Sequence, residues 1–195
     1  GLSNCRNEIV ARMDTDDIAY PDRFEKQINF FEQYPETDIV GSFATKMDET
    51  GKTYEIIKIP VTNKEIYRLI WTCPMIHPTV MFRKNKILEA GSYNPDSGPR
   101  QDDYELWFRC ANHNLNFANI AQPLLYYRFF SDSLRKNNYK VGWHRFKVGW
   151  NGCRKLKVHP VAYIGITVPF IRSILPSPLN IWFQKLMNKV NPRNR

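Results

Sequence analysis

The stretch ARMDTDD, residues 11–17, places three carboxylates within four positions, at Asp14, Asp16 and Asp17. It continues an apolar segment, EIVARM. Like charges at this spacing repel one another, and Mg²⁺ or Mn²⁺ would neutralise them, because hard cations take carboxylate oxygens as ligands. The alternative is a structural role, in which Asp16 or Asp17 caps the helix that begins near Pro21. The stretch alone leaves both interpretations open.

The segments around these acids predict an α/β fold. Residues 8–13 have the pattern of a short buried strand that carries the acids at its C-terminal end, where open α/β sheets bind ligands. Residues 21–35 predict a helix, with Phe24, Ile28 and Phe31 on its buried face. Further along the chain, strand-like segments alternate with short helical ones. Residues 37–48 and 52–60 predict a hairpin, and residues 115–130 predict two short strands broken at Gln122–Pro123.

A second acidic pair, Asp102 and Asp103, begins the helical segment DDYELWFRCANHN after a loop rich in Gly, Pro and Ser. A carboxylate at a helix start beside a loop can act as a general base on an incoming hydroxyl. The alternative is plain capping of the helix, since negative charge is favourable at a helix N-terminus. The pair is therefore a candidate catalytic site with a structural alternative.

Two further residues are candidates for the acceptor side of such a site. His77 precedes a proline at the start of a strand, in MIHPTVMF, and Trp107 lies in the helix that begins with the acidic pair. A lone histidine is more often a hydrogen-bonded structural residue than a ligand, and a helical tryptophan is more often core than a sugar platform. Neither residue predicts a function by itself.

Charge divides the chain at residue 132. Residues 1–132 hold 15 Lys and Arg against 19 Asp and Glu, whereas residues 133–195 hold 13 basic residues and no acid. A wholly basic tail favours an anionic surface as partner, either a membrane or a nucleic acid. Residues 177–192 predict an amphipathic helix, which packs on its own domain or lies in a membrane interface. The longest apolar run, residues 161–171, is shorter than the roughly 20 residues of a spanning helix.

Several ordered blocks resemble the inverting glycosyltransferases of family 2, which have the GT-A fold. ARMDTDDIAYPDRFEKQINFFEQYPETDIVGS resembles that family's metal-binding block, HPTVMFRK its acceptor-side strand, QDDYELWFRCA its catalytic-base helix and QPLLYYR its closing strand. The resemblance extends from Gly1 to about Arg128. It implies a GT-A-type mixed sheet flanked by helices over residues 1–132, followed by a basic helical tail over residues 133–195.

Residue by residue, the resemblance implies roles for the acids. Asp14 and Asp16 match the family's DxD, which serves the nucleotide and holds the cation on the donor diphosphate. Asp103 matches the general base that deprotonates the acceptor hydroxyl, and Asp102 stands where that family usually has Glu. His77 matches a recurrent histidine near the site.

The implied reaction transfers a sugar, with inversion, from a UDP- or GDP-type nucleotide sugar to a glycan or lipid-linked acceptor. The implied pathway is surface polysaccharide or lipopolysaccharide assembly. We expect a cytoplasmic protein at the inner face of the membrane, with Mn²⁺ or Mg²⁺ as cofactor, the tail on anionic lipid and no nucleic-acid partner. Four widely spaced cysteines without a CxxC agree with a reducing compartment. The rival hypothesis is a non-catalytic module that binds glycan, cation or membrane.

The resemblance also predicts that part of the family's architecture is missing. Its N-terminal nucleotide-binding half has no counterpart here, and a helix-and-turn segment between Asn7 and Glu8 is absent. The expectation is therefore a C-terminal two-thirds that is inactive alone and that exposes the EIVARM strand as an unpaired edge.

Overall fold

The computed structural model describes residues 1–130, 139–176 and the separate positions 179, 183 and 187. The helix expected at 177–192 lies outside the described residues. The elements, in chain order, are η1 (Leu2–Asn4), β1 (Ile9–Ala11), β2 (Ile18–Ala19), α1 (Arg23–Gln33), β3 (Ile39–Met47), β4 (Thr53–Ile57), α2 (Asn63–Arg68), η2 (Ile70–Thr72), η3 (His77–Thr79), β5 (Met81–Arg83), α3 (Lys84–Glu89), η4 (Pro95–Ser97), α4 (Asp102–Asn112), β6 (Phe117–Arg128), α5 (Tyr139–Leu156) and α6 (Val161–Ile174).

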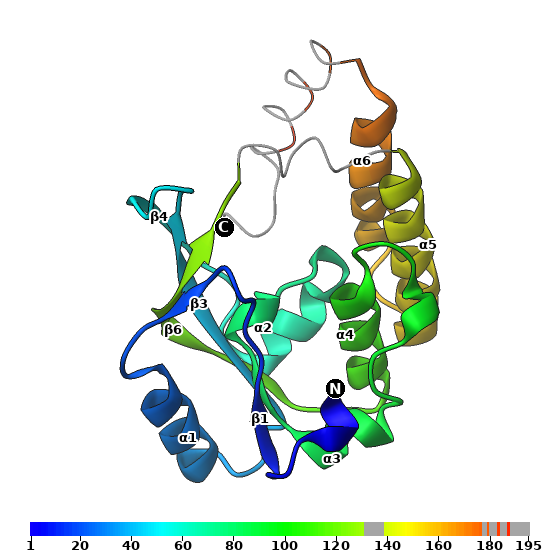
Figure 1. Ribbon diagram of the computed structural model, residues 1–195. Coiled ribbons are helices and arrows are strands. Elements are labelled where there is room, and N and C mark those ends of the chain that lie inside the picture. Colours follow the sequence, from blue (N-terminus) through cyan, green and yellow to red (C-terminus); the bar gives the residue numbers. More distant parts are fainter. Residues whose placement is uncertain (131–138, 177–178, 180–182, 184–186, 188–195) are drawn as a thin grey trace.

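The six strands form one mixed sheet, flanked by helices, in the order β1-β5-β3-β6-β2, with β4 paired to β3. The long central strands β3 and β6 are parallel, and the other pairs are antiparallel. The antiparallel pairing of β3 with β4 confirms the expected hairpin. The sheet and its helices confirm the expected α/β class (Figure 1).

Alternating side chains of the central strands build two cores, one on each face of the sheet. Val40 and Met81 pack with Phe31 of α1 on one face. Ile39, Phe82 and Phe117 face the other way, into the larger core shared with α2, α4, α5 and α6. The sheet is thus covered on both faces, with most of the helical layer on the side of α4 (Figure 1).

The buried face of α1 differs from the prediction. Phe24 and Ile28 are exposed, at 54% and 37% of their surface, and only Phe31 of the expected trio is buried. Arg23 and Gln27 occupy the interior instead. Gln27 donates to the carbonyls of Val40 and Thr79, and the Arg23 guanidinium donates to Gln27 Oε1 and to the carbonyl of Arg12. These hydrogen bonds offset the cost of burying the two polar side chains.

The break expected at Gln122–Pro123 is a bulge within one strand. β6 continues from Phe117 to Arg128, and its pairing with β3 shifts from Ser42↔Ile120 to Phe43↔Pro123. Two extra residues of β6 are accommodated there without ending the strand. Proline is tolerated at such a position because the bulge removes the need for its missing N–H.

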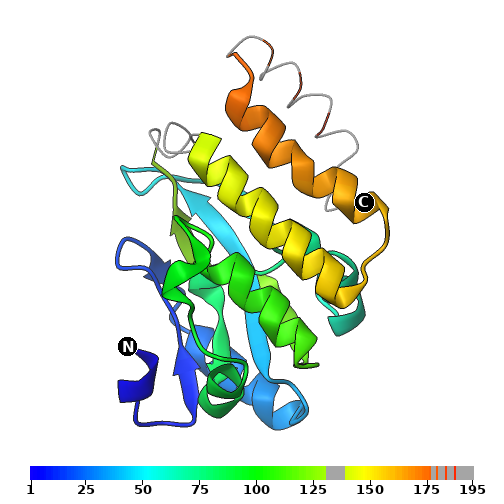
Figure 2. The ribbon, with the colours of Figure 1, turned by 90° about the vertical axis from the view of Figure 1, so that its right-hand side faces the viewer.

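The described helices of the basic segment pack on the rest of the chain. Cys153 of α5 and Ala162 and Ile166 of α6 belong to the same core as the central strands. Close approach of α5 to α4 depends on Gly152, where a side chain would overlap the ring of Phe108. Figure 2 shows α5 and α6 side by side as the outermost layer over α4. Among the described helices, none combines the length and apolar character needed to cross a membrane.

Candidate active site

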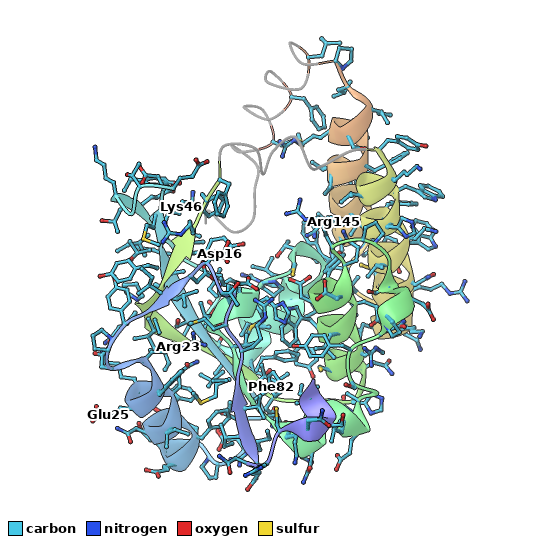
Figure 3. The ribbon with its side chains drawn as sticks, viewed as in Figure 1. Asp16, Arg23, Glu25, Lys46, Phe82 and Arg145 are labelled. Carbon is cyan, nitrogen blue, oxygen red and sulfur yellow. The ribbon has the colours of Figure 1, made fainter. Side chains whose placement is uncertain are left out.

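The acidic loop crosses one end of the sheet. β1, which precedes it, lies at one edge of the strand order, and β2, which follows it, lies at the opposite edge and pairs with Tyr126 and Leu125 of β6. The loop therefore passes over the ends of the strands between them, which agrees with the expected position of the acids at a strand end. Asp16 is labelled on this loop in Figure 3.

The three carboxylates converge within the loop. One oxygen from each of Asp14, Asp16 and Asp17 lies within 4.8 Å of the others. Asp14 forms a two-pronged ion pair with Arg12, at 2.7 and 2.9 Å. The cap of α1 is Asp22, so neither Asp16 nor Asp17 has the capping role that was the alternative reading.

Asp17 is the buried member of this group, at 6% exposure. Its Oδ1 accepts a hydrogen bond from the Arg128 backbone N–H at 2.8 Å, while its Oδ2 has no partner among the described residues. Burial, followed by the charges of Asp16 and Asp14, raises the pKa of Asp17 to about 6, although the Arg128 hydrogen bond opposes the shift. A buried carboxylate oxygen without a donor is costly, and a bound cation would satisfy it.

Arg128 fastens the loop to the end of β6. Its Nε donates to the carbonyl of Asp16 at 2.8 Å, and its Nη1 donates to the carbonyls of Asp48 and Glu49. These bonds hold the backbone of the acidic loop and leave the Asp16 side chain exposed. Exposed and buried oxygens on a fixed backbone form a donor set that suits Mg²⁺ or Mn²⁺.

Asp103 lies in a different environment, on the first turn of α4. The helix N-cap is Gln101, so Asp103 is not the capping residue. Its Oδ1 accepts from the Tyr104 N–H at 2.7 Å, and its Oδ2 accepts a weak bond from the Cys73 thiol at 3.7 Å. Burial raises the pKa of Asp103 despite these bonds. A carboxylate with a raised pKa is suited to proton transfer near neutral pH.

The neighbouring acid, Asp102, is exposed. Its negative charge adds to the burial that raises the pKa of Asp103. Asp102 thus acts on the half-buried Asp103 carboxylate through its charge. The acceptor-side contact predicted for Asp102 stays a prediction.

His77 lies in the interior beside Trp107. Its Nε2 shares a hydrogen bond of 2.9 Å with the Tyr93 hydroxyl, and its ring meets the Trp107 ring edge-on at 5.7 Å. Burial, together with the nearby Arg12 charge, lowers the pKa of His77 to about 3. The imidazole is therefore neutral near pH 7 and cannot serve there as a cationic group.

Trp107 has no exposed surface and packs on His77 and Phe117. A sugar platform must present an open ring face, so the structure favours the alternative role of Trp107 as a core residue.

Two tyrosines, Tyr127 and Tyr93, interact electrostatically with acids of the candidate site. Burial raises the pKa of Tyr127, and the charges of Asp17, Asp14 and Asp103 raise it further. Burial also raises the pKa of Tyr93; the Arg12 charge opposes this shift, and the charges of Asp102 and Asp103 add to it. Carboxylates of both acidic sites therefore act on Tyr127, whereas the carboxylates that act on Tyr93 are those of Asp102 and Asp103.

A cavity of about 440 Å³ lies elsewhere, between the η4 turn, α4 and α5. Its wall includes Asn94, Asn112, His144 and Lys155, and none of the residues predicted for the site. The residues beside the candidate site that sequence reasoning did not single out are Arg12, Cys73, Tyr127 and Arg128, and none of the four had a signal in the local sequence. Asp17 was already counted in the crowded acidic stretch.

Comparison with known proteins supplies the family. Residues 1–91 match the profile of Glycosyl transferase family 2. The amylovoran biosynthesis glycosyltransferase AmsE of Erwinia amylovora is 38% identical over 148 residues, which are 75% of this chain and 53% of AmsE. The chain belongs to glycosyltransferase family 2. The O-antigen biosynthesis glycosyltransferase WbnJ of Escherichia coli is 34% identical over 138 residues, 70% of this chain and 53% of WbnJ.

A solved structure shares the fold. The S. aureus TarS 1–349 structure in complex with UDP-GlcNAc superposes with a TM-score of 0.60 at 13% identity, over 88% of this chain and 50% of that one. This confirms the GT-A-type architecture expected from the resemblance. The chain spans about half the length of these family 2 relatives.

Proposed function

We propose that this chain carries the metal-binding and base-bearing side of an inverting glycosyltransferase that takes a UDP- or GDP-linked sugar as donor. The acceptor is a hydroxyl of a glycan or a lipid-linked saccharide in bacterial polysaccharide assembly. Relatives in amylovoran and O-antigen biosynthesis, and a neighbour that binds UDP-GlcNAc, support the donor and pathway class. The observation that carries the proposal is the pair of distinct carboxylate environments: three acid oxygens within 4.8 Å of one another in the loop, and Asp103 hydrogen-bonded to the Tyr104 N–H and the Cys73 thiol at the start of α4.

The donor end of the reaction belongs to the acidic loop. Asp16 and Asp14 would hold Mn²⁺ or Mg²⁺, with Asp17 as the buried third oxygen donor. Such a cation neutralises the charge of a departing diphosphate. Arg12, already paired with Asp14 at 2.7 Å, keeps a positive charge beside the same loop.

The acceptor end belongs to Asp103. Its carboxylate takes the proton from the acceptor hydroxyl, whose oxygen then forms a bond to the anomeric carbon of the donor sugar. The bond from that carbon to the diphosphate oxygen breaks, and its electron pair leaves with the nucleoside diphosphate. Attack opposite to the leaving group inverts the anomeric configuration.

The test is a transfer assay on the protein expressed from its complete gene, with the product configuration determined by NMR. Asp103→Asn and Asp16→Ala should each abolish most of the transfer, and chelation with EDTA should do the same reversibly. A product with retained configuration, or full transfer by Asp103→Asn, would overturn the proposed mechanism. Glycan or cation binding without transfer would favour the non-catalytic module.

We further propose that the protein is cytoplasmic and that the outer face of α5 lies on anionic lipid. Trp143, Lys147, Trp150 and Arg154 recur at helical spacing, and all four are exposed. Tryptophan and basic residues together favour a membrane interface. Sedimentation should show binding to phosphatidylglycerol vesicles that is weakened by salt and by Trp143→Ala with Trp150→Ala. Binding that ignores both lipid charge and the two substitutions would contradict this part.

A further inference from the structure

Arg145 belongs to the basic segment, yet it lies beside the proposed base and not on the outer face of α5. In Figure 3 it projects from α5 towards the sheet side of the molecule. Its guanidinium lies 4.4 Å from the centre of the Tyr104 ring, and its Nη2 donates to the carbonyl of Thr72 at 3.5 Å. None of the ion pairs within the described residues includes Arg145.

These two contacts fall on the two segments that hold Asp103. Thr72 directly precedes Cys73, whose thiol donates to Asp103 Oδ2. Tyr104 directly follows Asp103, and its N–H donates to Asp103 Oδ1. The Tyr104 hydroxyl also donates to the carbonyl of Trp71 at 2.6 Å, which ties α4 to η2 a second time. The Arg145 guanidinium therefore contacts both segments that hydrogen-bond to the Asp103 carboxylate: the end of η2 next to Cys73, and the first turn of α4.

We propose that Arg145 is the positioning residue of the base: it holds η2 and α4 together around Asp103 and supplies the positive charge that favours the ionised form of this half-buried carboxylate. The inference rests on the proposed function, in which Asp103 takes the acceptor proton.

The charges around Asp103 are consistent with this role. Asp102 on α4 contributes a negative charge that raises the pKa of Asp103, whereas Arg145 on α5 lowers it, as does the hydrogen bond from the Cys73 thiol on η2. Tyr93 and Tyr127, which also face the carboxylate, have raised pKa values and are neutral phenols near pH 7. Arg145 is the positive charge among the groups that act on the Asp103 pKa.

The direction of the effect follows. Without Arg145, the pKa of Asp103 rises further above its ordinary value, so the base is protonated at pH values where the wild type is ionised. In a variant without Arg145, the acidic limb of the profile of kcat/KM against pH should move to higher pH. At high pH, the kcat/KM values of the variant and the wild type should converge. A shift of about one pH unit corresponds to about a tenfold loss on the acidic limb.

The first experiment compares pH profiles of the protein expressed from its complete gene. Arg145→Met should shift the acidic limb upward, Arg145→Lys should restore most of the wild-type profile, and Lys140→Met, an exposed charge on the same helix, should change nothing. A loss that is uniform with pH, or a higher KM for the donor with an unshifted limb, would overturn the inference by showing a packing or substrate-binding role.

The second experiment needs no turnover. The carboxyl ¹³C signal of Asp103, assigned by its absence in Asp103→Asn, is titrated in the folded chain and in Arg145→Lys and Arg145→Met, with circular dichroism to verify folding. An upward shift of the titration in Arg145→Met supports the inference, and an unchanged titration refutes it. If Asp103→Asn retains transfer, the proposed function fails; if Asp103 is essential but Arg145→Met leaves its titration unchanged, only this inference fails.

Discussion

The acidic loop and the first turn of α4 use carboxylates in opposite ways. In the loop, three carboxylates crowd within 4.8 Å at the end of the sheet, and one of them, Asp16, is exposed. On α4, Asp103 is held between a backbone N–H and a thiol, and burial raises its pKa. The crowded negative charges of the loop attract a cation, even though burial raises the pKa of Asp17 there, whereas the single partly desolvated acid on α4 is ready to exchange a proton.

The acidic loop and Asp103 also differ in which part of the chain supplies the nearby positive charge. Arg12, two residues before Asp14, pairs with the loop from the same segment. The charge near Asp103 comes from Arg145, more than 40 residues further along the chain, on a helix of the basic segment. A segment that the charge distribution set apart as a surface tail thus contributes to the interior of the site. The following predictions test whether the two carboxylate sites differ in function as they differ in environment.

The largest expected effect is on turnover. Asp103→Asn should lower kcat by about 10² to 10⁴-fold while leaving the KM for the donor nearly unchanged, because a base acts in the transition state. Steady-state kinetics with saturating Mn²⁺ would measure both constants. Asp102→Asn is the matched control, and a larger loss in that variant would show that the base is one residue earlier.

The second prediction concerns the cation and pH. The pKa of Asp17 is raised to about 6, so at pH 5 the cation must displace its proton, whereas at pH 7.5 the carboxylate is already ionised. Mn²⁺ at about 100 times its dissociation constant should add about 2.7 kcal/mol to the free energy of unfolding at pH 7.5. Thermal unfolding should show a smaller gain at pH 5, and Asp16→Ala should show little gain at either pH. An equal gain at both pH values would contradict the assignment of Asp17.

The third prediction compares stabilities without metal. Burial raises the pKa of Asp103 in the folded protein, so ionising this carboxyl group opposes folding. The free energy of unfolding therefore falls as the pH rises from the ordinary Asp range through the raised pKa of Asp103. Asp103→Asn should therefore unfold at a higher denaturant concentration than the wild type at pH 7.5, and the advantage should shrink towards pH 4. The exposed Asp16→Asn should change the midpoint less. A larger shift of the unfolding midpoint in Asp16→Asn than in Asp103→Asn would mean that Asp103 is not the desolvated acid.

The smallest effect concerns His77. Its pKa is lowered to about 3 in the folded protein, so the unfolded chain binds a proton near pH 6.5 that the folded chain rejects. The stability that His77 contributes is present above pH 6.5 and is lost on acidification, at up to ~1.4 kcal/mol per pH unit. Between pH 6.5 and 5, His77→Gln should lose less stability than the wild type in urea titrations. Parallel losses would show that His77 is protonated in the folded state.

Sequence reasoning found the parts of the molecule that depend on local pattern. The acids Asp14, Asp16 and Asp103 lie at chain positions where neighbouring residues alone indicate a strand end or a helix start. The buried face of α1 was mistaken because the periodicity of Phe24 and Ile28 is apolar, whereas the interior needs Arg23 and Gln27 to satisfy strand carbonyls. No local sequence pattern predicts that these backbone carbonyls need hydrogen-bond donors.

Long-range partners could not be predicted for the same reason. The contact of Arg145 with Thr72 joins residues 73 positions apart, and that of Arg128 with Asp17 joins residues 111 apart. Each depends on how α5 or β6 packs in three dimensions. The tail helix expected at 177–192 stays a prediction.

The central claim is that the acidic loop binds the cation and Asp103 does not. Electron paramagnetic resonance of Mn²⁺, titrated into the chain with and without UDP, tests it in the wild type, Asp16→Ala and Asp103→Asn. We expect Asp16→Ala to lose most Mn²⁺ binding and Asp103→Asn to bind Mn²⁺ like the wild type. Equal binding by Asp16→Ala and the wild type, or a loss in Asp103→Asn as large as that in Asp16→Ala, would contradict it.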